Sequence, residues 1–141
     1  PQGVWLAADI ETPDKIGGQD EGELTPEDTS TQILRSNFAC NPNEGLTVPY
    51  HRDYIPIIDR LLTGPGIKVL WNKNYDLRRL QRAGHQINRM LCWDMMWAWH
   101  RLQSYLPRGL GFVAPFCSDY GAWKHLGKIP GKEGEYAAVD V

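Results

Sequence analysis

Hydrophobic residues fall into short runs in one part of the chain and into steps of three and four in another, which predicts strands alternating with helices. The apolar run at residues 4–8, stopped by polar residues, predicts a buried first strand. Residues 13–30, rich in Gly, Pro and acidic residues, predict a long exposed loop. Looser alternation at residues 31–39 and 46–48 predicts two further strands, joined as a hairpin across residues 41–45.

The middle of the chain shows helical spacing. Apolar residues in the range 52–62 step by three and four, and a Gly-Pro-Gly sequence at 64–66 ends that helix. Residues 68–71 predict a strand, and the spacing of apolar residues after Asn72 predicts a helix that stops at Gly84. A strand is therefore expected to lead directly into a helix at Asn72.

Beyond Gly84 the pattern is less regular. Residues 87–93 predict a fifth strand, and Asp94 is expected to cap a helix that ends at Pro107. The inner face of that helix is predicted to consist of Met95, Ala98, Trp99, Leu102 and Leu106. Gly and Pro break up residues 108–116, and residues 133–141 begin a last helix. Strands alternating with helices after an early hairpin predict a layered α/β or α+β domain with a mixed sheet.

Composition narrows the class of protein. With 141 residues, of which 42% are hydrophobic and 23% charged, the chain suits one domain. No apolar run approaches the roughly eighteen residues of a membrane-spanning helix, and the first residues do not resemble a signal peptide. Three cysteines at spacings that match no zinc motif indicate reduced thiols. We therefore expect a cytoplasmic protein with no membrane partner.

Charge is distributed unevenly between the two halves of the chain. The net charge is −2, but residues 1–66 carry four Lys or Arg against eleven Asp or Glu, whereas residues 67–141 carry eleven against six. The basic half is consistent with a surface that faces nucleic-acid phosphates and equally with ordinary solvated helix faces.

Asp9 and Glu11 follow the first predicted strand and are two residues apart, so both carboxylates leave the same face of the sheet. Two such carboxylates repel each other unless a cation lies between them, and Mg²⁺ or Mn²⁺ prefers oxygen ligands. The ordinary alternative is that they begin the acidic loop.

Asp76 lies in the first turn of the helix after Asn72, where an aspartate commonly interacts with free backbone amides. Its place beyond the carboxyl end of a strand also suits a ligand site.

Tyr136 and Asp140 are four residues apart on the last predicted helix, so the phenol and the carboxylate share one face. A tyrosine there commonly packs against the core, and the aspartate commonly faces water. In combination, however, the acids and the tyrosine form an ordered set: Asp-x-Glu after the first strand, Asp at a strand-to-helix junction, and Tyr-x-x-x-Asp on a late helix.

With this set the sequence resembles the DnaQ-like 3'–5' exonucleases of the DEDDy type, and most closely the proofreading exonuclease domains of bacterial and phage family A DNA polymerases. Residues 6–12 (Leu-Ala-Ala-Asp-Ile-Glu-Thr) resemble the first exonuclease motif. Residues 72–77 (Asn-Lys-Asn-Tyr-Asp-Leu) resemble the second motif, and residues 136–140 (Tyr-Ala-Ala-Val-Asp) the third in its tyrosine form. The similarity implies an RNase H-like α/β fold, with a five-stranded mixed sheet flanked by helices.

The resemblance also implies roles for individual residues. Asp9, Glu11, Asp76 and Asp140 match acids that bind two divalent cations, Mg²⁺ or Mn²⁺, and Tyr136 matches the residue that orients the attacking water. Asn72 matches a position that contacts the terminal nucleotides of the substrate. Contacts with nucleic acid are expected in and just after the first two motifs, at Ile10, Thr12, Asn72, Lys73, Tyr75 and Arg79. Whether the basic residues of the second motif contact a strand or complement a helix dipole is left open by the sequence.

The resulting expectation is an exonuclease that removes nucleotides from single-stranded or frayed DNA 3' ends in proofreading, replication or repair, within a bacterial or phage-infected cell. A DNA polymerase domain or subunit is an expected partner. RNA 3'-end trimming of the ribonuclease D kind and a catalytically inactive nucleic-acid-binding module are the alternatives. Residues 1–141 are interpreted as one exonuclease domain truncated at its C-terminal helix. The six tryptophans are most simply core residues, and a partner-binding face is the alternative.

Overall fold

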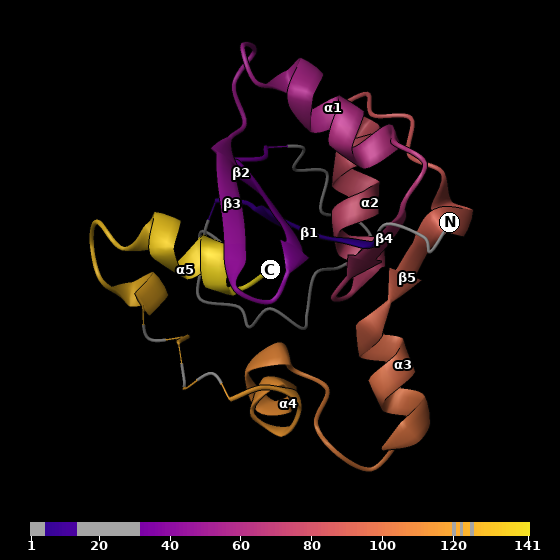
Figure 1. Cartoon of the computed structure of the whole chain (residues 1–141), viewed down its shortest axis with the longest axis vertical. Coiled ribbons are helices and arrows are strands. Elements are labelled where there is room, and N and C mark those ends of the chain that lie inside the picture. Colours follow the sequence, from indigo (N-terminus) through magenta and orange to yellow (C-terminus); the bar gives the residue numbers. More distant parts are fainter. Residues whose placement is uncertain (1–4, 14–31, 120, 122, 125) are drawn as a thin grey trace.

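A computed structural model describes residues 5–13, 32–119, 121, 123–124 and 126–141 (Figure 1). The predicted loop at 13–30 lies outside the described residues except for Pro13. The strands are β1 (Trp5–Glu11), β2 (Arg35–Asn41), β3 (Glu44–Pro49), β4 (Ile67–Leu70) and β5 (Cys92–Asp94). The helices are α1 (Ile55–Thr63), α2 (Lys73–Arg82), α3 (Met95–Leu102), α4 (Leu110–Cys117) and α5 (Glu133–Val139), with short 3₁₀ turns η1 (Arg89–Leu91) and η2 (Leu126–Lys128).

The five strands form one mixed sheet in the order β3-β2-β1-β4-β5. The pairs β1–β2 and β2–β3 are antiparallel, whereas β1–β4 and β4–β5 are parallel. The tight turn at Pro42 and Asn43 joins β2 to β3, so the predicted hairpin across residues 41–45 is confirmed. The predicted five-stranded mixed sheet flanked by helices is also confirmed.

The two faces of β1 have different roles. Ala8 and Ile10 point into the hydrophobic core, where Ile58 of α1 and Leu77 of α2 are almost fully buried. Because side chains alternate along a strand, Asp9 and the residues two positions before and after it project from the opposite face. The apolar residues of β1 therefore anchor the strand against α1 and α2, and that anchoring fixes where the carboxylates project.

Helix α5 packs against β3 and β2 (Figure 1). The contact is close at Gly45 in β3, where an added Cβ atom would lie 2.2 Å from the backbone oxygen of Ala138. Gly134 at the start of α5 similarly faces the methyl group of Thr47 in β3. Glycine at position 45 thus allows the helix to lie directly against the hairpin and sets the depth of the last turn of α5.

Several sequence predictions need correction. The strand expected at 87–93 is shorter, because the Asn88 side chain accepts a hydrogen bond from the Met90 amide and starts a 3₁₀ turn before β5. Asp94 does cap α3, by accepting a hydrogen bond from the Trp97 amide, but that helix buries none of its own residues, so its predicted inner face is wrong. A two-turn helix, α4, forms at 110–117 despite Pro115.

Figure 1 shows α3 and α4 at the end of the molecule remote from α1. Among the tryptophans, Trp123 is buried, but Trp5, Trp93 and Trp97 are each about half exposed, so the interpretation of all six as core residues is wrong. Within the described part of the chain, no helix combines the length and the apolar character that crossing a membrane requires.

Candidate metal centre

Three carboxylates meet at the end of β1. Asp9 and Glu11 leave the same face of that strand, and Asp140 follows the last turn of α5. One oxygen from each of the three carboxylates lies within 4.8 Å of the other two. The structure therefore brings together residues that are up to 131 positions apart in the chain, as the sequence predicted for Asp9, Glu11 and Asp140.

Asp9 is held by the neighbouring strand. It lies opposite Asn37 of β2 in the sheet register, and the Asn37 side-chain amide donates a 3.0 Å hydrogen bond to Asp9 Oδ2. Thr47 of β3 in turn donates a 2.8 Å hydrogen bond to the Asn37 amide oxygen. These two hydrogen bonds run across three strands and orient the Asp9 carboxylate. Both partners, Asn37 and Thr47, are uncharged.

Asp76 lies in the first turn of α2 with only 2% of its surface exposed. Burial, together with repulsion by the charge on Asp9, raises its pKa well above the ordinary value, and the nearby Arg79 guanidinium offsets only part of that effect. Its buried Oδ2 atom has no hydrogen-bond partner among the described residues. Such an atom carries a substantial desolvation cost unless a ligand or a cation occupies the space in front of it.

The surroundings of Asp9 likewise disfavour its ionised form. Burial, followed by repulsion from Glu11 and Asp140, raises the pKa of Asp9 from 3.8 to about 7. A divalent cation removes both causes, because it supplies the missing solvation and neutralises the repulsion. Among the described residues no lysine or arginine is bonded to Asp9. The clustered carboxylate oxygens are a donor set that fits a hard ion such as Mg²⁺ or Mn²⁺. Asp9, Glu11 and Asp140 can hold such an ion directly, with Asp76 buried beside them.

At the α5 end of the site, Tyr136 and Asp140 form the one-turn pair predicted from the sequence. The Tyr136 hydroxyl donates to Asp140 Oδ2 over 3.2 Å. Burial and the charge of Asp140 raise the pKa of Tyr136 to about 12. The phenol therefore stays protonated at neutral pH and can orient a molecule by hydrogen bonding without acting as a base.

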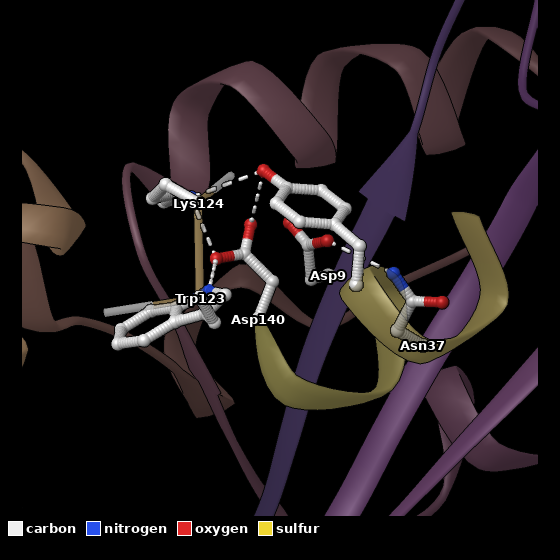
Figure 2. Close-up of polar contacts among 6 residues, drawn as sticks. Asp9, Asn37, Trp123, Lys124 and Asp140 are labelled. Carbon is white, nitrogen blue, oxygen red and sulfur yellow. Dashed lines mark hydrogen bonds and ion pairs between the residues drawn. The ribbon is translucent and has the colours of Figure 1, made fainter. Parts of the chain in front are cut away.

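Two further side chains contact Asp140, and the sequence interpretation missed both. Trp123 Nε1 donates to Asp140 Oδ1 at 2.9 Å, and Lys124 Nζ donates to the same oxygen at 2.6 Å (Figure 2). Lys124 Nζ also lies 3.1 Å from the Tyr136 hydroxyl. These residues precede α5 in a segment with no helical or strand periodicity, so only the three-dimensional structure shows their place. Asn37 was missed for a similar reason, since it is one polar residue within a predicted strand.

The residues expected to contact nucleic acid fall into two groups. Thr12 and Tyr75 share a 2.8 Å hydrogen bond between their hydroxyl groups, and Asn72 begins α2 in a left-handed conformation (φ 61°), all partly exposed. Ile10 and Arg79 are buried: Ile10 lies in the core, and the Arg79 guanidinium stacks 3.7 Å from the centre of the Tyr75 ring.

Lys73 is the remaining residue of that set. Its backbone amide donates to Asp94 at 3.1 Å and its ammonium to the Cys92 carbonyl at 3.0 Å. Asp94 therefore joins the start of α2 to the cap of α3. Lys73 and Arg79 both have structural contacts, and contact of any of the six residues with a nucleic acid stays a prediction.

A groove reaches the site from one side. Its lining comes from the β2–β3 turn, from α4 and from the end of α5, and it includes Asn41, Leu110, Trp123 and Asp140. Of the three clustered carboxylates, Asp140 is therefore the one that lines this groove next to the hairpin.

No protein-family model and no curated protein sequence matches this chain. Among solved structures, the chain is similar to the EXO domain of Nibbler from Aedes aegypti, with a TM-score of 0.69 and 10% sequence identity. The match covers 99% of this chain and 73% of the other. At that identity the likeness concerns the fold, and it shows that this chain has the RNase H-like α/β fold of an exonuclease domain.

Proposed function

We propose that this protein is a metal-dependent 3'–5' exonuclease that hydrolyses phosphodiester bonds at DNA 3' ends. The observation that carries the proposal is the convergence of Asp9, Glu11 and Asp140 within 4.8 Å, on a fold shared with an EXO domain. Tyr136 and the buried Asp76 complete the set that the three sequence motifs contain. A purely structural role has no use for so many acids in one place, because each unpaired buried carboxylate destabilises the fold.

In the proposed mechanism two divalent cations, when bound, supply the acidity that activates water and neutralise charge at the leaving 3' oxygen. The protein's own side chains position the ligand carboxylates and the attacking water. Asp9, Glu11, Asp76 and Asp140 are the proposed ligands, and the hydrogen bonds to Asp9 from Asn37 and to Asp140 from Trp123 restrict how those two carboxylates can turn. Tyr136, whose pKa is raised to about 12 by burial and by Asp140, keeps its proton and orients the attacking water.

The polarity and the sugar of the substrate rest on the motif resemblance. The three motifs resemble those of proofreading exonucleases in their order and in the tyrosine of the third, so a single-stranded or frayed DNA 3' end is the proposed substrate. A DNA polymerase domain or subunit is the proposed partner, in the cytoplasm of a bacterial or phage-infected cell. Thr12, Asn72 and Tyr75, at the partly exposed rim of the site, are the proposed contacts for the terminal nucleotides.

The test is cleavage of end-labelled strands. Single-stranded DNA and RNA, each labelled at the 5' end or at the 3' end, are incubated with the protein and Mg²⁺, Mn²⁺ or a chelator. We expect 5'-labelled DNA to shorten stepwise, 3'-labelled DNA to release labelled mononucleotide at once, and the chelator to stop both. The Asp76→Asn variant should be inactive, and Asp119→Asn, at an exposed position outside the three motifs, serves as the matched control.

Other outcomes identify the alternatives. Shortening of RNA with DNA left intact indicates an RNA-trimming enzyme. Binding of both strands without any shortening, with Mg²⁺ or Mn²⁺ present, indicates an inactive nucleic-acid-binding module and contradicts the proposal.

A further inference from the structure

Lys124 places a positive charge inside the acidic site. Its ammonium donates to Asp140 Oδ1 over 2.6 Å and to the Tyr136 hydroxyl over 3.1 Å, and Figure 2 shows Lys124 directed toward Asp140. The Asp140 side chain is only 13% exposed and that of Lys124 is 38% exposed. This is a partly buried ion pair, for which screening by water is much weaker than at an open surface.

The surroundings hold Lys124 in this position. The Lys124 stem passes over Gly111 of α4, where an added Cβ atom would lie 3.2 Å from Lys124 Cγ. Trp123, the preceding residue, is buried and fixes the same Asp140 oxygen through its indole N–H. The ammonium also lies 5.2 Å from the centre of the Tyr136 ring, within range of a cation–π interaction. Lys124 is thus packed on two sides and bonded at its end, unlike an ordinary surface lysine.

The Lys124 ammonium pairs with Asp140 at one end of the site. Asp140 accepts from this ammonium and from the Trp123 indole, whereas the donors to Asp9 among the described residues, the Asn37 side-chain amide and the Ile10 backbone amide, are neutral. A lysine ammonium is charged at neutral pH, so the 2.6 Å contact of Lys124 Nζ with Asp140 Oδ1 places a positive charge directly on that carboxylate.

We propose that Lys124 is a positioning residue that acts as a resident counter-ion: it holds Asp140 and Tyr136 in place without metal and competes with a divalent cation for Asp140. The inference rests on the metal site of the proposed function and not on the substrate. Because Asp140 Oδ1 already accepts two protein hydrogen bonds, metal coordination by Asp140 weakens its pairing with Lys124. Lys124 thereby sets the metal affinity of the site.

The first experiment measures Mn²⁺ binding by isothermal titration calorimetry without substrate, for the unaltered protein, Lys124→Met and Lys124→Arg. Methionine keeps an unbranched apolar stem without the charge, and arginine keeps the charge. We expect Lys124→Met to bind Mn²⁺ about tenfold more tightly, equivalent to about 1.4 kcal/mol, and to unfold at a lower temperature in chelator. Lys124→Arg should resemble the unaltered protein in both measurements. Unchanged or weaker Mn²⁺ binding by a folded Lys124→Met, or an arginine variant that behaves like methionine, overturns the inference.

The second experiment needs no variant and stands if Lys124→Met does not fold. Lysine acetylation is followed by mass spectrometry with and without saturating Mg²⁺ in the unaltered protein. Mg²⁺ should increase modification at Lys124, because loss of the Asp140 partner frees the amine, and should leave the exposed Lys128 unchanged. Equal reactivity of Lys124 under both conditions overturns the inference.

The two proposals fail separately. If no protein form binds Mn²⁺, the metal site and the counter-ion role are both wrong. If Mn²⁺ binds with equal affinity to the unaltered protein and Lys124→Met, the exonuclease proposal stands and the Lys124 inference fails. If Lys124→Met binds Mn²⁺ more tightly while no nucleic acid is shortened, the counter-ion role stands and the exonuclease proposal fails.

Discussion

Replacing Asp9 by asparagine should stabilise the metal-free protein, and by an amount that depends on pH. Burial and the charges of Glu11 and Asp140 raise the pKa of Asp9 from 3.8 to about 7, so the folded state resists its ionisation. Asparagine has the same shape, carries no charge and keeps an oxygen that can accept the Asn37 hydrogen bond. The substitution therefore removes the repulsion while leaving the contacts of β1 with β2 in place.

The size of the effect follows from proton linkage. Below the ordinary value of 3.8 the carboxyl is protonated in both the folded and the unfolded chain, so ionisation contributes nothing. As pH rises from 3.8 to about 7 the unfolded chain releases this proton first, and the folded unaltered protein loses stability across that window. At about 1.4 kcal/mol for each pKa unit, the full loss is about 4 kcal/mol above pH 7. For a chain of this size that corresponds to about 10 °C in melting temperature.

Thermal unfolding in chelator at pH 4 and pH 8 tests this reasoning. Asp9→Asn should unfold about 10 °C above the unaltered protein at pH 8 and at nearly the same temperature at pH 4. Asp119→Asn, at an exposed position, is the control for the chemistry of the substitution itself. Saturating Mg²⁺ should raise the melting temperature of the unaltered protein more than that of Asp9→Asn, since binding to the folded state stabilises it. An equal gain at both pH values, or none at pH 8, would refute the argument from carboxylate repulsion.

Three further substitutions test other links between fold and site. Tyr136→Phe should slow strand cleavage about a hundredfold and leave Mn²⁺ affinity unchanged, because only the water-orienting hydroxyl is lost; weaker Mn²⁺ binding in titration would mean that Tyr136 supports the metal site directly. Gly45→Ala places a Cβ 2.2 Å from the Ala138 oxygen. It should lower the free energy of unfolding in urea by about 1–3 kcal/mol and weaken Mn²⁺ binding by displacing α5. Gly109→Ala, with open space around it, should change neither quantity. Ile58→Ala removes a fully buried side chain. It should lower the free energy of unfolding by about 3 kcal/mol with an unchanged denaturant slope. A decrease below about 1 kcal/mol would show that Ile58 does not anchor α1.

Local sequence patterns predicted the elements whose burial is regular. The apolar run that ends at Ala8 and the helical steps through Ile58 and Leu77 reflect contact with one hydrophobic core, and those elements are present. The prediction failed for α3, since its apolar residues repeat at helical spacing but Met95 and Leu102 are exposed. Periodicity shows that a face is apolar, and it does not show what covers that face.

In the candidate site, too, some residues could be found from local sequence patterns and others only from the folded structure. Asp9 with Glu11, and Tyr136 with Asp140, could be singled out because each pair lies at a fixed step on one strand or helix. Asp76 was singled out by its place at a strand-to-helix junction, and the roles of all five residues came from the motif resemblance. Asn37 and Lys124 act across the sheet and across a loop, 28 and 16 positions from their partners, and no local spacing encodes such contacts. Their roles follow from register and packing, which only the folded chain displays.

The dispersal of the carboxylates along the chain means that the proposed metal ligands come together only after α5 has been synthesised. Asp9, Glu11 and Asp76 belong to elements that precede α5, and the site lacks Asp140 until α5 reaches the hairpin. At about 5–20 residues per second the ribosome takes about 3–13 s to proceed from position 76 to position 140. During that interval the nascent chain holds three acids without their fourth member. Assembly of the proposed metal ligands is thus coupled to the docking of α5 on the hairpin.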